Sequence, residues 1–367
     1  MNECRAVRAF ARRLEVAVAC GLVAALAAAC EHSSVAPGVS DSDPRPSSLP
    51  ALDVVKRFIA PDPVATFDGS GQVAHPDVVY TPPGAFAYPW HLVLTPTPYG
   101  IATYEDPSVY ASVDGVSWRV EPGAVNPVAQ PRPDAFGEQL SDPALVYVPE
   151  ARELWLYYRS FTADSDLVWL TRSGDAITWT EPAVVLAVAS GEALSPSVVH
   201  RAPGEWRMWT VSGHCADGPT QLFVRESADG LSWSSPAPVS LPGLMPWHVF
   251  VRWVDGLSMW VMATNVKRGS GSCLTRRLYL ATSGDGLEWT PRARPWLVAG
   301  GDLAGLFSAV VYRTAFAEVG DSLRFWYSGA SSVDPRCDLA GAACPRPLLR
   351  WSSLGTEIRP LADVVPR

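Results

Sequence analysis

One short motif recurs along the chain and constrains its fold more than any other feature. The motif reads Ser-x-Asp-Gly-x-x-Trp in residues 112–118. Its copies begin at Ser112, Ser173, Ser227 and Ser283, and a degenerate fifth copy begins at Ser352. The first four serines stand 61, 54 and 56 residues apart. A unit that returns at such intervals is typical of repeat architectures, in which each repeat is one supersecondary unit.

Short apolar runs surround each copy of the motif. The run that opens each repeat covers residues 76–80, 143–147, 196–200, 248–251 and 308–312. These runs are rich in β-branched and aromatic side chains and are separated by Gly, Pro and Asp, which is typical of strands joined by tight turns. Five such units predict an all-β fold, a five-bladed β-propeller with four antiparallel strands in each blade.

The residues of the motif have structural reasons to recur. Asp-Gly supplies the positive φ that a tight hairpin needs, and the Ser and Asp side chains can bond the backbone of the turn. The Trp offers a large face to wedge between blades. The motif resembles the Asp-box of sialidases but lacks the residue that this box has between Asp and Gly, so a six-bladed sialidase is the weaker match.

Composition limits the classes of protein and partner. The chain has 367 residues, 48% of them hydrophobic and only 18% charged, with a formal net charge of -8. We expect one large domain over residues 51–367, because the repeat runs through most of the chain, and we expect it to be a monomer. An acidic chain without a basic stripe excludes nucleic acid as a partner.

The N-terminus predicts export. Four arginines precede an apolar stretch that is too short to span a bilayer, and residues 1–29 therefore read as a signal peptide. The end of this segment, Leu-Ala-Ala-Ala-Cys, resembles a bacterial lipoprotein signal, which implies lipidation of Cys30 and a membrane anchor. Ordinary secretion is the alternative. Residues 30–50 are rich in Ser, Pro and Asp and predict a disordered tether.

Four cysteines remain after the signal and Cys30. They are Cys215, Cys273, Cys337 and Cys344. An even number in an exported chain favours disulfides, and unpaired thiols are the alternative. Metal binding by these cysteines is disfavoured, because neither a CxxC motif nor clustered histidines accompany them.

Polar residues open the predicted inner strands, which converge around the axis of a propeller. His75, Asp142 and Ser195 share one position when the repeats are aligned on the apolar run that follows. Asp77 stands two residues after His75 and is expected to face the same way in an extended strand. Glu105 belongs to an acidic pair that precedes the third strand of the first repeat.

Residues 70–355 resemble the superfamily of five-bladed glycoside hydrolases that contains arabinanases, β-xylosidases, levansucrases and invertases, and in particular a bacterial branch of it. The resemblance rests on the repeated hairpin motif and on Asp-Pro at inner-strand starts. It implies catalysis by carboxylates from different inner strands. Asp142 matches the acid before proline in the second blade. His75 occupies the position of the expected base, with Asp77 displaced by two residues, and Ser195 lies where the general acid is expected.

These considerations give a set of candidate site residues. The candidate catalytic residues are Asp77, Asp142 and Glu105. The candidate substrate-binding residues are His75, His248, Trp247, Arg159, Arg313 and Ser195. Each also has a structural interpretation: a strand cap, an Asx turn, a buried histidine or an ion pair between blades.

The sequence thus predicts an exported carbohydrate-active protein whose partner is an oligo- or polysaccharide, with hydrolysis of a glycosidic bond in an axial funnel. The alternative is a glycan-binding or scaffold propeller without catalysis. No cofactor and no metal ligand set is predicted. The resemblance implies that some members hold a structural cation on the axis, which this sequence does not show.

Overall fold

The computed structural model describes residues 58–59, 63–214, 218–267, 275–301, 307–332, 349–352 and 354–365. They belong to one structural unit, which spans Asp53–Arg367. The predicted signal peptide, the tether, the lipidation site and the candidate disulfides lie outside the described residues and stay predictions. The cysteines concerned are Cys30, Cys215, Cys273, Cys337 and Cys344.

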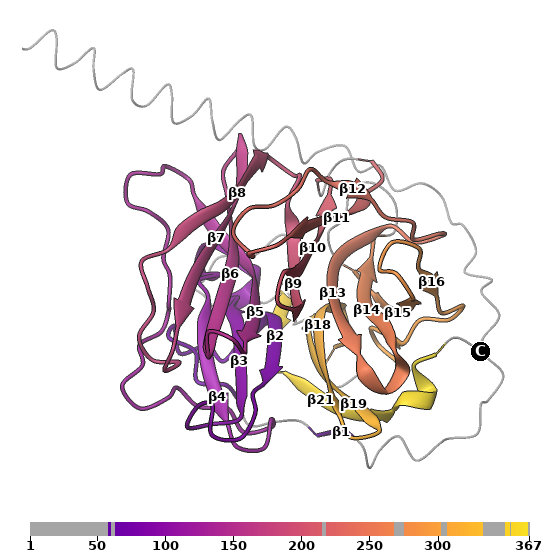
Figure 1. Ribbon diagram of the computed structural model, residues 1–367, viewed down its shortest axis with the longest axis horizontal. Helices are drawn as coiled ribbons and strands as arrows, with labels where there is room; N and C mark the ends of the chain where they lie inside the picture. Colours follow the sequence, from indigo (N-terminus) through magenta and orange to yellow (C-terminus); the bar gives the residue numbers. More distant parts are fainter. Residues whose placement is uncertain are drawn as a thin grey trace, which may run out of the picture. The chain divides into compact units, whose positions relative to one another are not determined.

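The described strands form five antiparallel sheets arranged radially around an axis (Figure 1). Each sheet is one blade and contributes its first strand to the centre. These inner strands are β2 (Val73–Tyr80), β5 (Gln139–Val148), β9 (Leu194–Ala202), β13 (Pro246–Val254) and β18 (Val310–Val319). Each inner strand lies beside two others, so that β2, β5, β9, β13 and β18 close a ring. The prediction of a five-bladed β-propeller is confirmed.

The remaining strands of the first three blades follow in sequence order from the axis outward. Blade one adds β3 (Trp90–Pro96) and β4 (Ser108–Ser112), and a bridge between Ala111 and Arg119 stands in for its fourth strand. Blade two adds β6 (Glu153–Phe161), β7 (Ser165–Ser173) and β8 (Ala183–Ala189). Blade three adds β10 (Glu205–Ser212), β11 (Gln221–Ser227) and β12 (Ala237–Pro238).

Blades four and five have branched outer edges. Blade four adds β14 (Met259–Val266) and β15 (Arg277–Ser283), and both β16 (Thr290–Pro291) and β17 (Leu297–Val298) pair with β15. Blade five adds β19 (Ser322–Ser332), which pairs with both β20 (Leu349–Trp351) and β21 (Gly355–Pro360). The outermost strand of blade five is β1 (Phe58–Ile59), which pairs with β21. The first described strand therefore completes the last blade.

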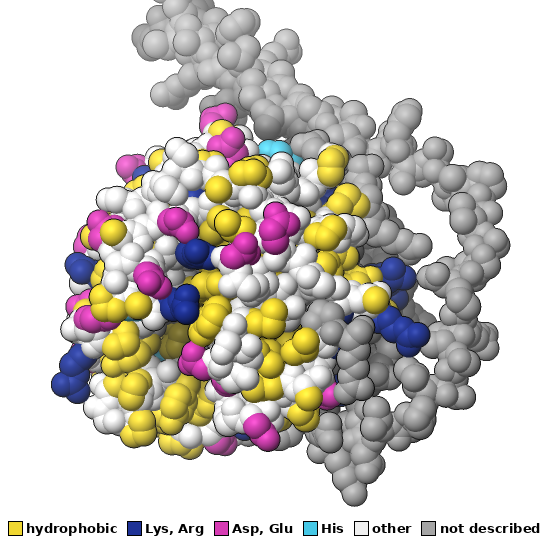
Figure 2. Space-filling view, turned by 45° about the vertical axis from the view of Figure 1, so that its right-hand side comes forward, with side chains coloured by type: hydrophobic (Ala, Val, Ile, Leu, Met, Phe, Trp, Pro, Cys, Tyr) yellow, Lys and Arg dark blue, Asp and Glu magenta, His cyan; other side chains and the backbone are white. Residues whose placement is uncertain are grey.

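Helical structure is limited to short 3₁₀ turns in the described residues. They are η2 (Pro98–Gly100), η3 (Ala102–Tyr104), η4 (Asp255–Leu257) and η5 (Leu361–Asp363). Among the described residues, no helix has the length and apolar character to cross a membrane. Acidic side chains are spread between apolar and uncharged ones over the face drawn in Figure 2, in keeping with the net charge of -8.

The repeated motif forms the hairpin turns at the outer part of the blades. In the first copy, the Ser112 hydroxyl accepts a hydrogen bond from the Gly115 amide at 2.9 Å. The Asp114 carboxylate accepts the amides of Val116 and Ser117 at 2.8 and 2.9 Å. The copies at Ser227 and Ser283 repeat these bonds. The prediction that the motif is scaffold, with its Ser and Asp bonded to its own backbone, is confirmed.

The same turns join neighbouring blades. Trp326 of blade five donates its indole N–H to the Gly115 carbonyl of blade one at 2.8 Å, and Trp209 of blade three donates to Gly286 of blade four at 3.1 Å. Tyr157 of blade two bonds the Gly230 carbonyl of blade three at 2.9 Å. Three of the five junctions between blades are thus held by a buried aromatic side chain that bonds a turn carbonyl.

The inner strands share a β-bulge near their beginning. The register shifts between Ala74 and Asp77 in β2 and between Ser141 and Ala144 in β5, and β9 shifts at the corresponding point. The bulged residues His75, Asp142 and Ser195 have φ of 53°, 51° and 54°. A bulge bends its strand and redirects a side chain, and here it turns these residues towards the axis.

Candidate functional site

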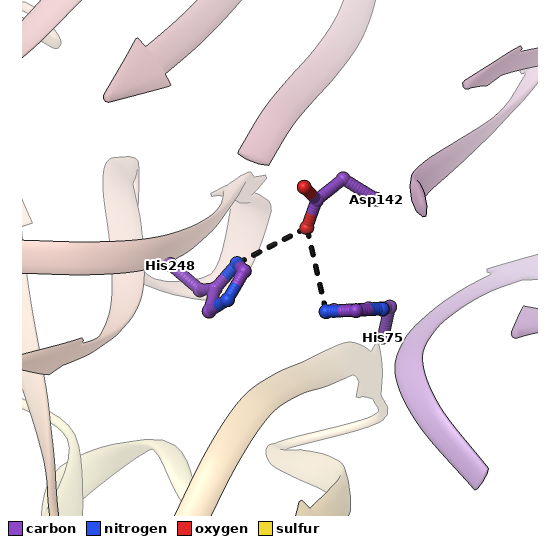
Figure 3. A group of neighbouring side chains, drawn as sticks. All are labelled: His75, Asp142 and His248. Carbon is purple, nitrogen blue, oxygen red and sulfur yellow. Dashed lines mark ion pairs between the residues drawn. The ribbon is translucent and has the colours of Figure 1, made fainter. Parts of the chain in front are cut away.

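Three buried side chains meet where the inner strands of blades one, two and four begin (Figure 3). The Asp142 Oδ1 atom lies 3.1 Å from His248 Nδ1 and 3.6 Å from His75 Nε2. All three residues are at most 2% exposed. The ligand atoms of this set lie within 4.8 Å of one another. We call His75, Asp142 and His248 the axial triad.

The contacts of His75 fix which of its ring nitrogens faces the triad. Its Nδ1 lies 2.9 Å from the Thr95 hydroxyl oxygen. Thr95 donates its own proton to the Ala74 carbonyl at 3.4 Å, so it accepts from His75 Nδ1–H. The lone pair of Nε2 is therefore left to point at Asp142. A hydrogen bond of this kind at the second nitrogen is what orients a metal-binding histidine.

The electrostatics of the triad favour neutral imidazoles beside an ionised carboxylate. Burial lowers the pKa of His75 to about 3, although Asp142 pulls in the opposite direction. Burial also lowers the pKa of His248. Burial alone would raise the pKa of Asp142, but the two histidines and Arg313 outweigh it and hold this pKa well below its ordinary value.

The triad fits a divalent metal ion. His75 Nε2 and His248 Nε2 are buried and have no hydrogen-bond partner, and Asp142 Oδ1 and His248 Nδ1 lie 3.1 Å apart without the geometry of a hydrogen bond. Buried polar atoms without a partner are costly unless something else satisfies them. Two neutral imidazoles and one carboxylate are a common protein ligand set of catalytic metal sites, which keep a further position open for water or substrate.

Glu105 lies beside the triad, on the connection that joins β3 to β4. Its Oε2 atom is 3.8 Å from His75 Nδ1, and its side chain is 14% exposed. Burial, and then the neighbouring charge of Asp142, raise the pKa of Glu105 well above its ordinary value, while Arg159 acts in the opposite direction. A carboxyl with a raised pKa is suited to taking up and returning a proton.

Aromatic rings cover the other side of the triad. Tyr312 meets the His248 ring edge-on at 4.4 Å between centroids and the His75 ring at 5.2 Å. Trp351 packs edge-on against Tyr312 at 4.9 Å. Trp247, which is 6% exposed, contacts His248 at 5.8 Å. These rings hold the histidines in place and lower the local polarity.

A second layer of charge lies further along the axis. Arg252 Nη2 is 2.5 Å from Asp77 Oδ1, and Arg313 reaches Asp77 Oδ2 and Asp142 Oδ1 at 3.9 Å each. Asp77 and Arg313 are fully enclosed. Asp77 and His75 therefore both face the axis but lie at different depths, because the bulge between them breaks the simple alternation expected from the sequence.

Beyond this layer, the opposite mouth of the ring contains a cavity of about 350 Å³. Arg252 lines it, together with the far ends of the inner strands. Its other polar or aromatic lining residues are Tyr80, Tyr147, His200, Trp253, Asp255, Phe316 and Glu318. None of the triad residues belongs to this lining, so the cavity is separated from the triad by the Asp77–Arg252–Arg313 layer.

Two further predicted substrate contacts have internal partners. Arg159 lies 2.7 Å from Asp166 and 3.7 Å from Asp142, so its ion pairs run within blade two rather than between blades. The Ser195 hydroxyl accepts the Val249 amide at 3.1 Å and joins β9 to β13. Seven of the predicted site residues thus lie close together in the structure: His75, His248, Asp142, Glu105, Trp247, Arg159 and Arg313. Ser195 instead bonds the backbone of β13, and Asp77 pairs with Arg252.

Sequence reasoning did not recognise the triad as a ligand set, nor the parts played by Thr95, Asp166 and Tyr312. The signal was present in the alignment of strand openings, which placed His75 and Asp142 at one position and His248 at the start of the fourth inner strand. Metal motifs are usually recognised by close spacing in sequence, whereas these ligands are brought together only by the closed ring.

Comparisons with known proteins agree with this fold. No known family profile matches the sequence. A crystal structure of an N-acetylgalactosamine deacetylase from F. plautii, in complex with blood group B trisaccharide, aligns with a TM-score of 0.72 and 24% identity, over 84% of this chain and 95% of that one. A family 62 glycoside hydrolase in complex with xylotriose aligns with a TM-score of 0.53 and 14% identity, over 83% of this chain and 97% of the other.

The chain shares the fold of five-bladed propeller glycoside hydrolases. A family 117 glycoside hydrolase from Zobellia galactanivorans also aligns, with a TM-score of 0.51 and 13% identity, over 83% of this chain and 91% of the other. In sequence, the chain is 27% identical over 314 residues to the A type blood N-acetyl-α-D-galactosamine deacetylase of Flavonifractor plautii. The match covers 70% of this chain and 40% of that relative. Each of the relatives named here is a carbohydrate-active enzyme.

Proposed function

We propose that this propeller removes the acetyl group from an N-acetylated sugar, at a divalent metal ion held by His75, Asp142 and His248. The observation that carries the proposal is the set of buried ligand atoms that face one another without hydrogen-bond partners. The similarity to a sugar deacetylase supports the choice of reaction. A divalent ion bound at such a site supplies a Lewis acid that polarises a carbonyl and lowers the pKa of water.

The remaining chemistry is assigned to residues of the chain. Amide hydrolysis adds the oxygen of water to the acetyl carbon, breaks the C–N bond, and passes a proton to the leaving amine as acetate departs. We assign to Glu105 the transfer of a proton from water to the amine, which is supported by the contact of its side chain with His75 and by its raised pKa.

Tyr312 supplies the second group needed for this reaction. Burial, and then the nearby charges of Glu105 and Asp142, raise the pKa of the Tyr312 phenol, so the phenol keeps its proton at neutral pH. Its ring lies against both histidines of the triad. The O–H group is therefore suited to donate a hydrogen bond to the oxygen on which negative charge develops.

Hydrolysis of a glycosidic bond is the second candidate. The observation in its favour is the opposite displacement of two pKa values, raised for Glu105 and lowered for Asp142. Such a separation of acid and base is how paired carboxylates divide their work in glycosidases. The close approach of two histidines to Asp142 Oδ1 favours the metal site over this alternative.

A product assay tests the proposal. The full chain, supplied with Zn²⁺ or Mn²⁺, is incubated with oligosaccharides that carry N-acetylated sugars and with the same oligosaccharides after chemical deacetylation. We expect acetate from the first set without new reducing ends and no product from the second. New reducing ends without acetate would support the glycosidase instead, and binding without either product would support a glycan-binding propeller.

A further inference from the structure

We propose that Arg159 is a positioning residue that, held by Asp166, fixes the orientation of the Asp142 carboxylate so that one oxygen faces the histidines. This inference rests on the proposed metal site. It concerns residues of blade two only, with Asp142 on β5, Arg159 on β6 and Asp166 on β7. It replaces the expected contact between Arg159 and substrate by a role exerted through a ligand.

The two oxygens of Asp142 have different surroundings. Oδ1 faces both histidines of the triad and lies 3.9 Å from Arg313 Nη1. Oδ2 accepts the Ser141 hydroxyl at 3.1 Å and lies 3.7 Å from Arg159 Nη1. A carboxylate held in this way on one oxygen cannot rotate freely, and the other oxygen keeps its lone pairs directed at the metal position.

Arg159 uses its two terminal nitrogens for two different carboxylates. While Nη1 faces Asp142, Nη2 donates to Asp166 Oδ1 at 2.7 Å. The guanidinium also lies over the Phe161 ring at 4.3 Å, and the side chain is 9% exposed. The planar fork of arginine can bridge two acceptors at fixed angles, which the single ammonium of lysine cannot do.

Asp166 is itself immobilised. It is fully buried, and its Oδ2 atom accepts the backbone amides of Gly191 and Ala193 at 3.0 Å each. These amides belong to the connection that leads from β8 into β9. The chain of contacts therefore runs from rigid backbone through Asp166 and Arg159 to the metal-facing carboxylate.

Titration of the full chain with Zn²⁺, followed by calorimetry, tests the inference. Arg159→Met should weaken Zn²⁺ binding by about 10–100-fold, the usual effect of losing an outer partner of a metal ligand. Arg159→Lys should recover only part of this loss. Asp166→Asn, a milder change that keeps an acceptor for the backbone amides, should weaken binding in the same direction. Combining Arg159→Met with Asp166→Asn should add little, because both act through one path.

Arg225→Met is the matched control. Arg225 is also a buried arginine of the propeller, 3% exposed, and it donates to Thr210 at 3.0 Å without contacting the triad. We expect it to lower thermal stability while Zn²⁺ affinity stays at the wild-type value. Wild-type affinity in folded Arg159→Met and Asp166→Asn would overturn the positioning role alone. A wild-type chain that binds no divalent ion would overturn the metal site and this inference with it.

Discussion

His75 and Asp142 occupy equivalent positions in neighbouring blades, and both hold a left-handed backbone, with φ of 53° and 51°. For a residue with a Cβ atom, this backbone conformation is less stable by about 1–2 kcal/mol. Ser195 holds the same conformation in blade three, where its hydroxyl joins two inner strands instead. The bulge at the start of the inner strand thus directs two of the three triad residues towards the axis.

Asp142→Asn tests the role of the central carboxylate. The amide keeps the shape of the side chain but removes the charge that balances a divalent ion, so we expect metal affinity to fall by at least about 100-fold, beyond the usual loss for an outer partner. Calorimetric titration measures it. Asp285→Asn serves as control, because Asp285 lies in an exposed turn and its carboxylate accepts only backbone amides and a serine hydroxyl. Equal affinities for the two variants would argue against the triad as ligand set.

Glu105→Gln tests proton transfer. Because the pKa of Glu105 is raised above its ordinary value of 4.5, the wild-type turnover should fall as pH decreases through a midpoint above 4.5, where the base becomes protonated. The variant should lose about 10²–10⁴-fold in kcat and should no longer show this acidic limb. Steady-state rates between pH 4 and 9 decide the matter. A variant that retains the limb would assign it to another group.

Asp106→Asn tests a carboxyl that lies next to Glu105 in sequence but outside the triad. Burial raises the pKa of Asp106 from 3.8 to about 6, so its contribution to stability is fully present below pH 3.8 and is lost as pH rises through 6. Removing the charge should therefore stabilise the fold at pH 8 by about 1–3 kcal/mol. Denaturant unfolding at pH 4 and pH 8 measures this, and the benefit should nearly vanish at pH 4. A benefit independent of pH would contradict the assignment.

Gly115→Ala tests the attachment between blades one and five. Gly115 has a φ of 72°, and an added Cβ would lie 2.8 Å from Arg324 and 3.2 Å from Trp90. Gly69 has a similar φ of 75° with nothing within 4 Å. Both substitutions should therefore cost about 1–2 kcal/mol of backbone strain, and Gly115→Ala a further 1–3 kcal/mol or so of overpacking. Equal melting temperatures for the two variants would show that this contact does not hold the blades together.

The fold was predictable because the motif carries the side chains that stabilise its own hairpin turn. Each of the four full copies from Ser112 onward carries the Ser and Asp side chains that bond its own turn and the Trp that follows them, so local signals indicate the repeated blades. The ring closure through β1 was not predicted, because two strand residues, Phe58 and Ile59, carry no pattern of their own.

The site was predictable only in part. The convergence of strand openings placed His75, Asp142 and His248 near one axis, which the structure confirms. Their role as a ligand set could not be predicted from the sequence. The bulge changes the depth of Asp77 relative to His75, and the residues that hold the triad in place come from other strands. Thr95 lies on the second strand of blade one and Asp166 on the third strand of blade two, and neither stands near a triad residue in sequence.

We expect acetate release to depend on an ion bound by the triad. The most direct measurement is the rate of acetate release from an N-acetylated oligosaccharide by the full chain, first stripped with a chelator and then given divalent metal in increasing amounts. We expect no release without metal, full recovery at one ion per chain, and no recovery for Asp142→Asn. Unchanged release from the stripped chain, or recovery of Asp142→Asn at the same metal level, would contradict it.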